Sequence, residues 1–221
     1  MATVVGPAAY SGAGAPVPNV RVDHFGAQVV TDAGGRYQEA CSNGELFCGA
    51  NQSAVALTAA LATTYTGLSL ANPAGSGVRM EIVTVGISAN AVASAATSFG
   101  LIGGWAAAGI ATHTTPITVT LYGSCLIGPN SAGATGSKGL LDAASTLVGT
   151  PRWLAMFGQA GTVATTSDGF VFSGLFDLAS QFAIDPGGYF AIGATVANTA
   201  AYFLSITWRE RAITSVGGPG V

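Results

Sequence analysis

The chain carries very little charge. Only 8% of its 221 residues are Asp, Glu, Lys or Arg, whereas an ordinary globular domain carries about 25%. Two long runs contain no such residue: the segment between Glu45 and Arg79 and the segment between Glu81 and Lys138. A free-standing domain stays dispersed through its charged surface. We therefore expect much of this protein's surface to be covered by other protein chains.

Basic residues are scarce as well, and this excludes one class of partner. The chain has seven Lys and Arg residues and a formal net charge of −3. Nucleic-acid binding needs clustered basic side chains that displace counterions from phosphates. We predict no nucleic-acid partner.

No segment has the composition of a membrane span. The best candidate, residues 86–112, is free of charge, but its apolar residues are mostly Ala and Gly. A spanning helix needs about 20 strongly apolar residues. Residues 1–7 have neither the basic region nor the long apolar run of a secretory signal. The sequence thus predicts no membrane partner and no export signal.

Catalytic and cofactor-binding motifs are also missing from the sequence. The two histidines, His24 and His113, lie in no recognisable catalytic pattern. The ten Asp and Glu residues include no close pair suited to a metal ion or to glycoside hydrolysis. There is no phosphate-binding loop, dinucleotide fingerprint or G-x-S-x-G motif. We predict that the protein is not an enzyme and holds no cofactor or metal ion.

The three cysteines, Cys41, Cys48 and Cys125, are too few and too scattered for a disulfide framework. Asn43-Gly44 is a strong tight-turn dipeptide between the first two. If it forms a two-residue hairpin loop, the thiols of Cys41 and Cys48 face different partners and miss each other. We expect three reduced, buried thiols.

What the chain does contain is a two-residue period of apolar side chains. In residues 117–122 and 202–209, and again in 78–82, apolar residues alternate with polar ones, which is typical of half-buried antiparallel strands. Further strands are predicted at residues 55–61, 67–70, 170–176, 182–184 and 189–194. Residues 139–145 could form one helical turn.

Turn residues separate these strands. Pro and Gly cluster at residues 72–77, 128–133 and 185–188, and a Thr/Ser/Asp/Gly loop occupies 165–169. About eight strands joined by such loops predict an all-β fold, an antiparallel β-sandwich that is jelly-roll-like and spans residues 51–221.

Residues 1–50 differ from the rest and predict an extended N-terminal arm. They are rich in Pro, Gly and Ala, and short strands are expected at 28–31 and 36–39. Such an arm has too little apolar content to fold alone and would lie on a neighbour. The candidate interaction residues are Pro7, Tyr10, Pro16 and Pro18 of the arm, together with Trp105.

Trp105 stands between small residues in Gly103-Gly104-Trp105-Ala106, so it is either an exposed loop anchor or a core residue. Trp208, by contrast, shares a strand face with three apolar residues and is predicted to be in the core. The edges of the sandwich lack the lysines that guard exposed edges, because the only lysine is Lys138, in a loop. Some edges should therefore be covered by the arm, a symmetry mate or a lattice.

Four segments resemble parts of structural proteins of tailed bacteriophages: residues 64–77, 113–116, 184–191 and 203–210. The resemblance covers approximately residues 36–210 and implies a jelly-roll-like virion component without catalytic residues.

Two functions follow as expectations. The first is a capsid decoration, or cement, protein on the exterior of a virion assembled in the host cytoplasm. It would form a homo-oligomer, expected to be a homotrimer, and bind the major capsid protein or another virion protein. The alternative is a tail fibre or spike module that binds a surface glycan through Trp105 or the loop at residues 128–139.

Overall fold

The computed structural model describes residues 37–59, 61–90, 93, 95–106, 112–116, 122–125, 136–160, 173–197 and 200–213. The predictions for Pro7, Tyr10, Pro16 and Pro18 lie outside these residues, as do the strand at 28–31 and the loops at 128–133 and 165–169.

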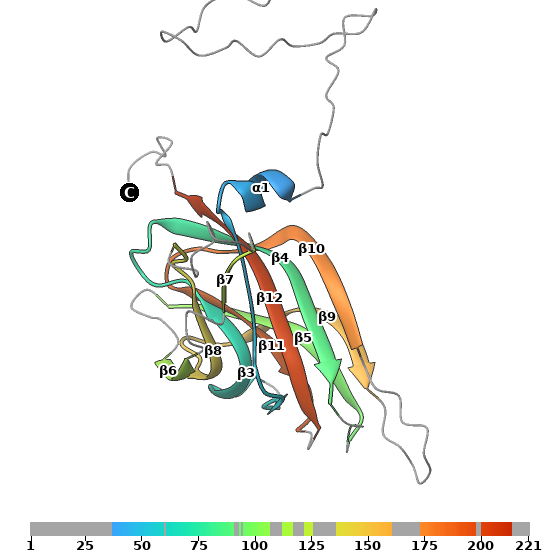
Figure 1. Ribbon diagram of the computed structural model, residues 1–221. Coiled ribbons are helices and arrows are strands. Elements are labelled where there is room, and N and C mark those ends of the chain that lie inside the picture. Colours follow the sequence, from blue (N-terminus) through green and yellow to red (C-terminus); the bar gives the residue numbers. More distant parts are fainter. Residues whose placement is uncertain are drawn as a thin grey trace, which may run out of the picture. The chain divides into compact units, whose positions relative to one another are not determined.

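The described chain is almost entirely β-structure in two antiparallel sheets. One helix precedes them, α1 (Gln38–Ser42). The strands are β1 (Leu46–Ala50), β2 (Val55–Ala56), β3 (Thr64–Ala71), β4 (Val78–Ala89), β5 (Thr97–Trp105), β6 (Thr112–Pro116), β7 (Tyr122–Ser124), β8 (Leu140–Thr146), β9 (Arg152–Ala160), β10 (Ser173–Ile184), β11 (Gly188–Ala194) and β12 (Ala201–Ala212). The front sheet has the order β10-β4-β12-β1-β7, with β2 also paired to β12, and the back sheet has the order β6-β8-β3-β11-β5-β9 (Figure 1).

The strand order is that of a jelly roll. Eight strands form its frame, in chain order β1, β3, β4, β5, β9, β10, β11 and β12. The front sheet takes the first, eighth, third and sixth of them, and the back sheet takes the second, seventh, fourth and fifth. Strands β6, β7 and β8 are inserted between β5 and β9, and they widen both sheets. The predicted all-β, jelly-roll-like sandwich is confirmed.

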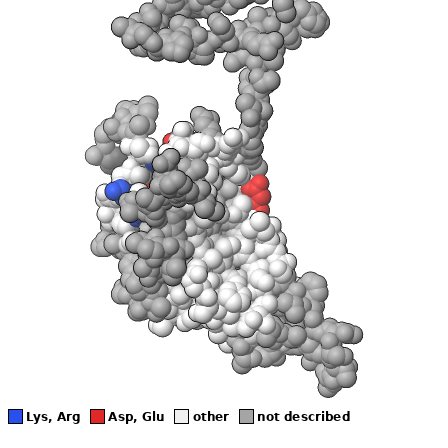
Figure 2. Space-filling model, in the orientation of Figure 1, with Lys and Arg blue, Asp and Glu red and all other residues white. Residues whose placement is uncertain are grey.

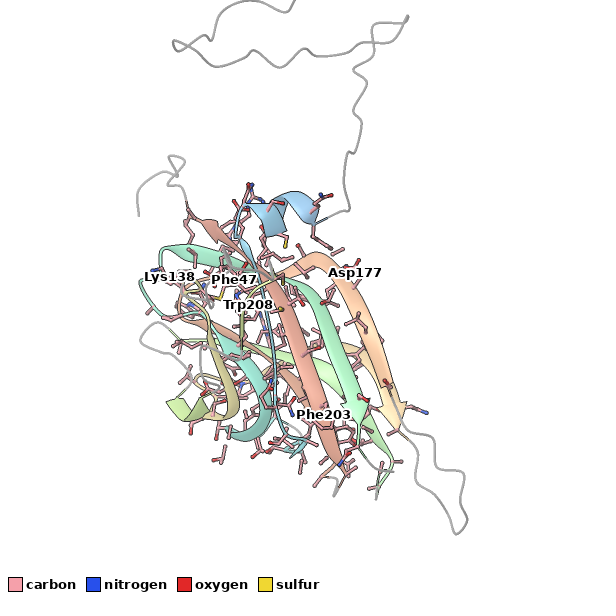
Figure 3. All side chains as sticks on the ribbon, viewed as in Figure 1. Phe47, Lys138, Asp177, Phe203 and Trp208 are labelled. Atoms are coloured by element: carbon pink, nitrogen blue, oxygen red, sulfur yellow. The ribbon has the colours of Figure 1, made fainter. Side chains whose placement is uncertain are left out.

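The core lies between the sheets and follows the two-residue period. Along β12, Tyr202, Leu204, Ile206 and Trp208 are buried while Phe203 points outward. Trp208 stacks on Phe47 of β1, with ring centroids 6.0 Å apart (Figure 3). The alternation at residues 202–209 therefore predicted the inward face correctly.

The segment around Asn43-Gly44 differs from the predicted hairpin. Residues 38–42 form α1 instead of a strand, and Gly44, at φ +70°, ends the helix. The amide of Gly44 donates to the Cys41 carbonyl, and that of Glu45 donates to the Ala40 carbonyl. These two bonds are a Schellman motif, which needs a glycine in the left-handed region. The same dipeptide suits a helix end as well as a hairpin.

One segment that the sequence placed in the N-terminal arm belongs to the front sheet. β1 (Leu46–Ala50), which the sequence placed in the arm, pairs with both β12 and β7 within the front sheet. Its apolar side chains pack into the sandwich core, where Phe47 is buried.

Several strand predictions needed correction. Residues 139–145 form no helical turn, because 140–146 are strand β8, and among the described residues of 55–61 only Val55 and Ala56 form a strand, β2. Residues 173–176 and 182–184 of the two predicted segments belong to one strand, β10, whose alternation is interrupted by a bulge. β5 and β9 were not predicted. In β5, glycines occupy positions where an apolar side chain would reveal the period, and in β9 residues 153–157 are all apolar, so no alternation is visible.

Candidate functional site

The outer face of the front sheet is formed by the outward side chains of β10, β4 and β12. The strand register places its residues in cross-strand rows. The first row is Ser173, Ser88 and Phe203, and the second is Leu175, Gly86 and Ser205. Every member of these rows is uncharged.

Two large apolar side chains stand on this outer face. Leu175 is 74% exposed and Phe203 is 43% exposed. A methyl group at Gly86 would lie 2.3 Å from Ser205 Oγ and 3.5 Å from Leu175 Cδ1. Because Gly86 has no side chain, the side chains of Ser205 and Leu175 on the neighbouring strands can cover β4 at this point. The resulting surface is flat and apolar.

On the face that Figure 2 shows, the charged side chains lie toward the end of the front sheet that is away from Phe203. Lys138 and Asp177 both lie away from Phe203 (Figure 3). Farther along β12, Arg209 pairs with Glu45 at 2.6 Å and Arg211 with Glu81 at 3.6 Å. The described part of the outer face therefore has a charged end and an uncharged end.

The edge strand β10 is protected by a bulge. Within the described chain it pairs only with β4, and the register shifts between Asp177 and Phe182. Ala179 and Ser180 adopt positive φ there, and Asp177 Oδ1 accepts a hydrogen bond of 2.8 Å from the Ala179 amide. Such a bulge disfavours strand addition. This edge needs no covering partner to prevent edge-to-edge pairing.

A second candidate site is a groove of about 1040 Å³ between the ends of the edge strands, which we call the Trp105 groove. Phe157 of β9 and Phe176 of β10 bring these strands together, with ring centroids 4.7 Å apart. Toward residues 152 and 184 the strands no longer meet, and the groove opens. It is lined by residues 103–105, Thr150, Arg152, Leu154, 181–185 and 188–190.

Trp105 lies at this groove and is 60% exposed. Its indole N–H donates a hydrogen bond of 3.1 Å to the Pro186 carbonyl. Of the two predicted alternatives, the structure therefore shows the exposed residue and not the core residue. The ring's polar atom is already satisfied, so the ring offers its apolar face.

Arg152 adds a polar group to the groove that sequence reasoning missed. Arg152 is opposite Gly103 in the β5–β9 register, two residues from Trp105, so both share a strand face. The Tyr189 side chain packs with Ile102 and Ala191 on the opposite face of the back sheet, and its buried hydroxyl has no hydrogen-bond partner among the described residues. Burial raises the pKa of Tyr189 to about 12, so the hydroxyl remains a donor at neutral pH. Only the register, which a single sequence does not reveal, brings Arg152 and Trp105 together.

The thiols are only partly buried, and two of them, Cys48 and Cys125, are neighbours, a pairing that was not predicted. Cys41, Cys48 and Cys125 are all free, and each is half-buried. Cys48 is opposite Gly123, and the Cys125 amide donates to the Leu46 carbonyl, so Cys48 and Cys125 are diagonal neighbours across β1 and β7. The Cys125 thiol donates a hydrogen bond to Cys48, which lowers the pKa of Cys48 to about 7 against the opposing effect of burial.

No helix within the described segments is long and apolar enough to cross a membrane. Among the described side chains, no three His, Cys, Asp or Glu residues are grouped to hold a metal ion. Comparisons with protein-family models, with curated proteins and with solved structures found no match to this chain.

Proposed function

We propose that the protein is a structural component of a virus particle, a capsid decoration protein that binds the major capsid protein as a homotrimer. The observation that supports this most directly is the uncharged end of the outer face, with Leu175 and Phe203 exposed on it. Large apolar side chains on a low, charge-free surface are typical of a surface that contacts other protein.

The energetics favour such a role. Burying one Leu or Phe side chain contributes about 1.5–3 kcal/mol, so each copy of the outer face would bind a neighbour only modestly. On a shell with many identical sites, copies that also hold one another in an oligomer gain avidity without new contacts. The charged end, with Arg209, Arg211 and Asp177, would fix the orientation of the contact rather than its strength.

The fold is compatible with this function but does not decide it. Jelly rolls with two packed sheets occur in viral capsid domains and also in lectins, and one fold hosts many functions. The proposal therefore rests on the outer face and on the resemblance of four sequence segments to phage structural proteins.

Electron microscopy of intact particles that contain this chain tests the proposal. We expect hundreds of copies on the outer surface of the head, with density for the front sheet facing a capsid subunit or another copy. Complete absence from the head would contradict the proposal. The protein should also cosediment with heads from which it has been stripped.

A second candidate function, recognition of a surface glycan from a tail fibre or spike, is favoured by a different observation. The Trp105 groove presents an exposed aromatic ring beside polar side chains. About a dozen copies at the tail, with none on the head, would favour this function over capsid decoration.

A further inference from the structure

The Trp105 groove has a fixed aromatic wall. The indole N–H is held by the Pro186 carbonyl, and the neighbouring loops approach the residue closely. A methyl group at Gly187 would lie 3.2 Å from the indole nitrogen, and one at Gly149 would lie 2.6 Å from the Trp105 carbonyl oxygen. Both glycines also have positive φ. These loops keep the ring in place while 60% of the residue stays exposed, so a ligand would meet a preorganised apolar face.

The groove also has one uncompensated cation. Arg152 is exposed and makes no ion pair or hydrogen bond with any residue in the described part of the chain. The other charged lining residue, Asp185, is already paired with Arg79, with Nε and Oδ1 2.7 Å apart. The groove therefore favours a ligand with a negative group.

Neutral polar groups complete the lining. Gln181, placed at the groove by the bulge in β10, can both donate and accept, and Thr150 offers a hydroxyl.

These features together specify the chemistry of the occupant. It has an apolar face that stacks on an indole ring, hydroxyl groups at its edge and an anionic group close by. Sugar rings that carry a carboxylate combine all three. The volume of about 1040 Å³ is slightly above the range of about 300–1,000 Å³ found for ligand sites, which suits several linked rings better than one.

We propose that the Trp105 groove binds an acidic oligosaccharide, with one ring stacked on Trp105 and a sugar carboxylate paired with Arg152. This site lies between β9 and β10, apart from the outer face that carries the proposed capsid contact. The proposal names the class of glycan that the second candidate function would recognise. It does not depend on the capsid function.

Isothermal titration of the full chain tests this proposal. The probes are alginate oligosaccharides and polysialic acid fragments, with maltooligosaccharides as neutral sugars and poly-glutamate as an acidic peptide. We expect binding of at least one acidic sugar, weaker binding of the neutral sugars, and an affinity that falls as salt rises.

Two substitutions separate the contributions of the ring and the cation. We expect Trp105→Ala to weaken acidic-sugar binding by about 10-fold or more. Arg152→Gln should remove the preference for acidic over neutral sugars together with the salt dependence. Both residues are exposed, so thermal unfolding should change little. Met156→Ala is the matched control, since Met156 is an exposed apolar residue of β9 that does not line the groove.

Three outcomes overturn the proposal. The first is no binding of either acidic sugar at millimolar concentration. The second is binding that both Trp105→Ala and Arg152→Gln leave unchanged. The third is poly-glutamate binding as tightly as the sugars, which would make the groove a peptide site. None of these affects the capsid proposal, which is tested by the location of the protein in the particle.

Discussion

The indole N–H of Trp208 donates a hydrogen bond of 3.0 Å to Glu210 Oε1, two residues along the same face of β12. The same carboxylate accepts hydrogen bonds from the Ser137 hydroxyl at 2.6 Å and from the Lys138 and Gly139 amides at 2.9 and 3.1 Å. Glu210 is itself buried. One carboxylate of the front sheet thus anchors the segment that leads into β8 of the back sheet.

Replacing Glu210 by Ala should lower the free energy of unfolding by about 3 kcal/mol or more, because several buried donors lose their acceptor. Glu210→Gln should cost less, since one side-chain oxygen still accepts. Urea unfolding followed by circular dichroism measures both. Asp185→Asn is the control: it removes an exposed ion pair with Arg79 and should cost at most about 1 kcal/mol. Equal losses for Glu210→Ala and Asp185→Asn would show that the buried carboxylate is not a structural anchor.

Gly67 and Gly75 differ both in backbone conformation and in the crowding around them. Both have φ in the range that favours glycine, +141° and +78°. A methyl group at Gly67 would lie 2.7 Å from Tyr65 Cζ and from Leu57 Cδ2, whereas one at Gly75 would meet nothing within 4 Å. Gly75→Ala should therefore cost about 1 kcal/mol, from backbone strain alone.

Gly67→Ala should cost about 2 kcal/mol more than Gly75→Ala, because φ +141° is less accessible to Ala than φ +78° and because the methyl group also displaces the Tyr65 ring. That ring is buried, and its hydroxyl donates to the Ile192 carbonyl of β11. Thermal unfolding of the two variants measures the difference. If both melt at the same temperature, crowding at Gly67 has been overestimated.

The sequence predicted the fold well where one face of a strand is solvated, and poorly elsewhere. The alternation in β12 gave its inward residues correctly, whereas the glycines of β5 and the bulge of β10 hid the period. Asn72 illustrates a second limit. It was predicted only as part of a turn, yet its buried side chain donates to the carbonyls of Val78 and Ile184 and so ties β4 to β10.

The candidate sites were less predictable than the fold. Trp105 was singled out, but the sequence left its exposure open. Arg152 and Gln181 reach the same groove only through the β5–β9 register and the bulge in β10. Leu175 and Phe203 lie on one surface because β4 separates their strands. Long-range strand pairing decides each of these, and local propensity carries little information about it.

Cys48 should be alkylated fastest once the pH exceeds about 7, where its thiolate predominates. The hydrogen bond from the Cys125 thiol lowers the pKa of Cys48 from 9.0 to about 7, because it stabilises the thiolate. The rate of iodoacetamide labelling at Cys48, followed by peptide mass spectrometry, should therefore rise through pH 7 and then level off.

Cys125→Ala provides the contrast. It removes the donor and leaves only burial, which raises the pKa of Cys48. The midpoint of labelling should move by more than one pH unit to the alkaline side. An unchanged midpoint in this variant would mean that Cys125 does not stabilise the Cys48 thiolate.

Leu175→Lys should reduce self-association and attachment to stripped heads, because it places a charge within the uncharged end of the outer face. Leu175 is 74% exposed, so the folded chain loses little and its melting temperature should stay within a few degrees. Met156→Lys is the matched control: it adds the same charge at a half-exposed apolar residue of β9 in the back sheet. Sedimentation velocity and cosedimentation with heads measure both effects. If the two variants lose attachment equally, net charge is responsible rather than the outer face, and if neither does, the contact lies elsewhere on the molecule.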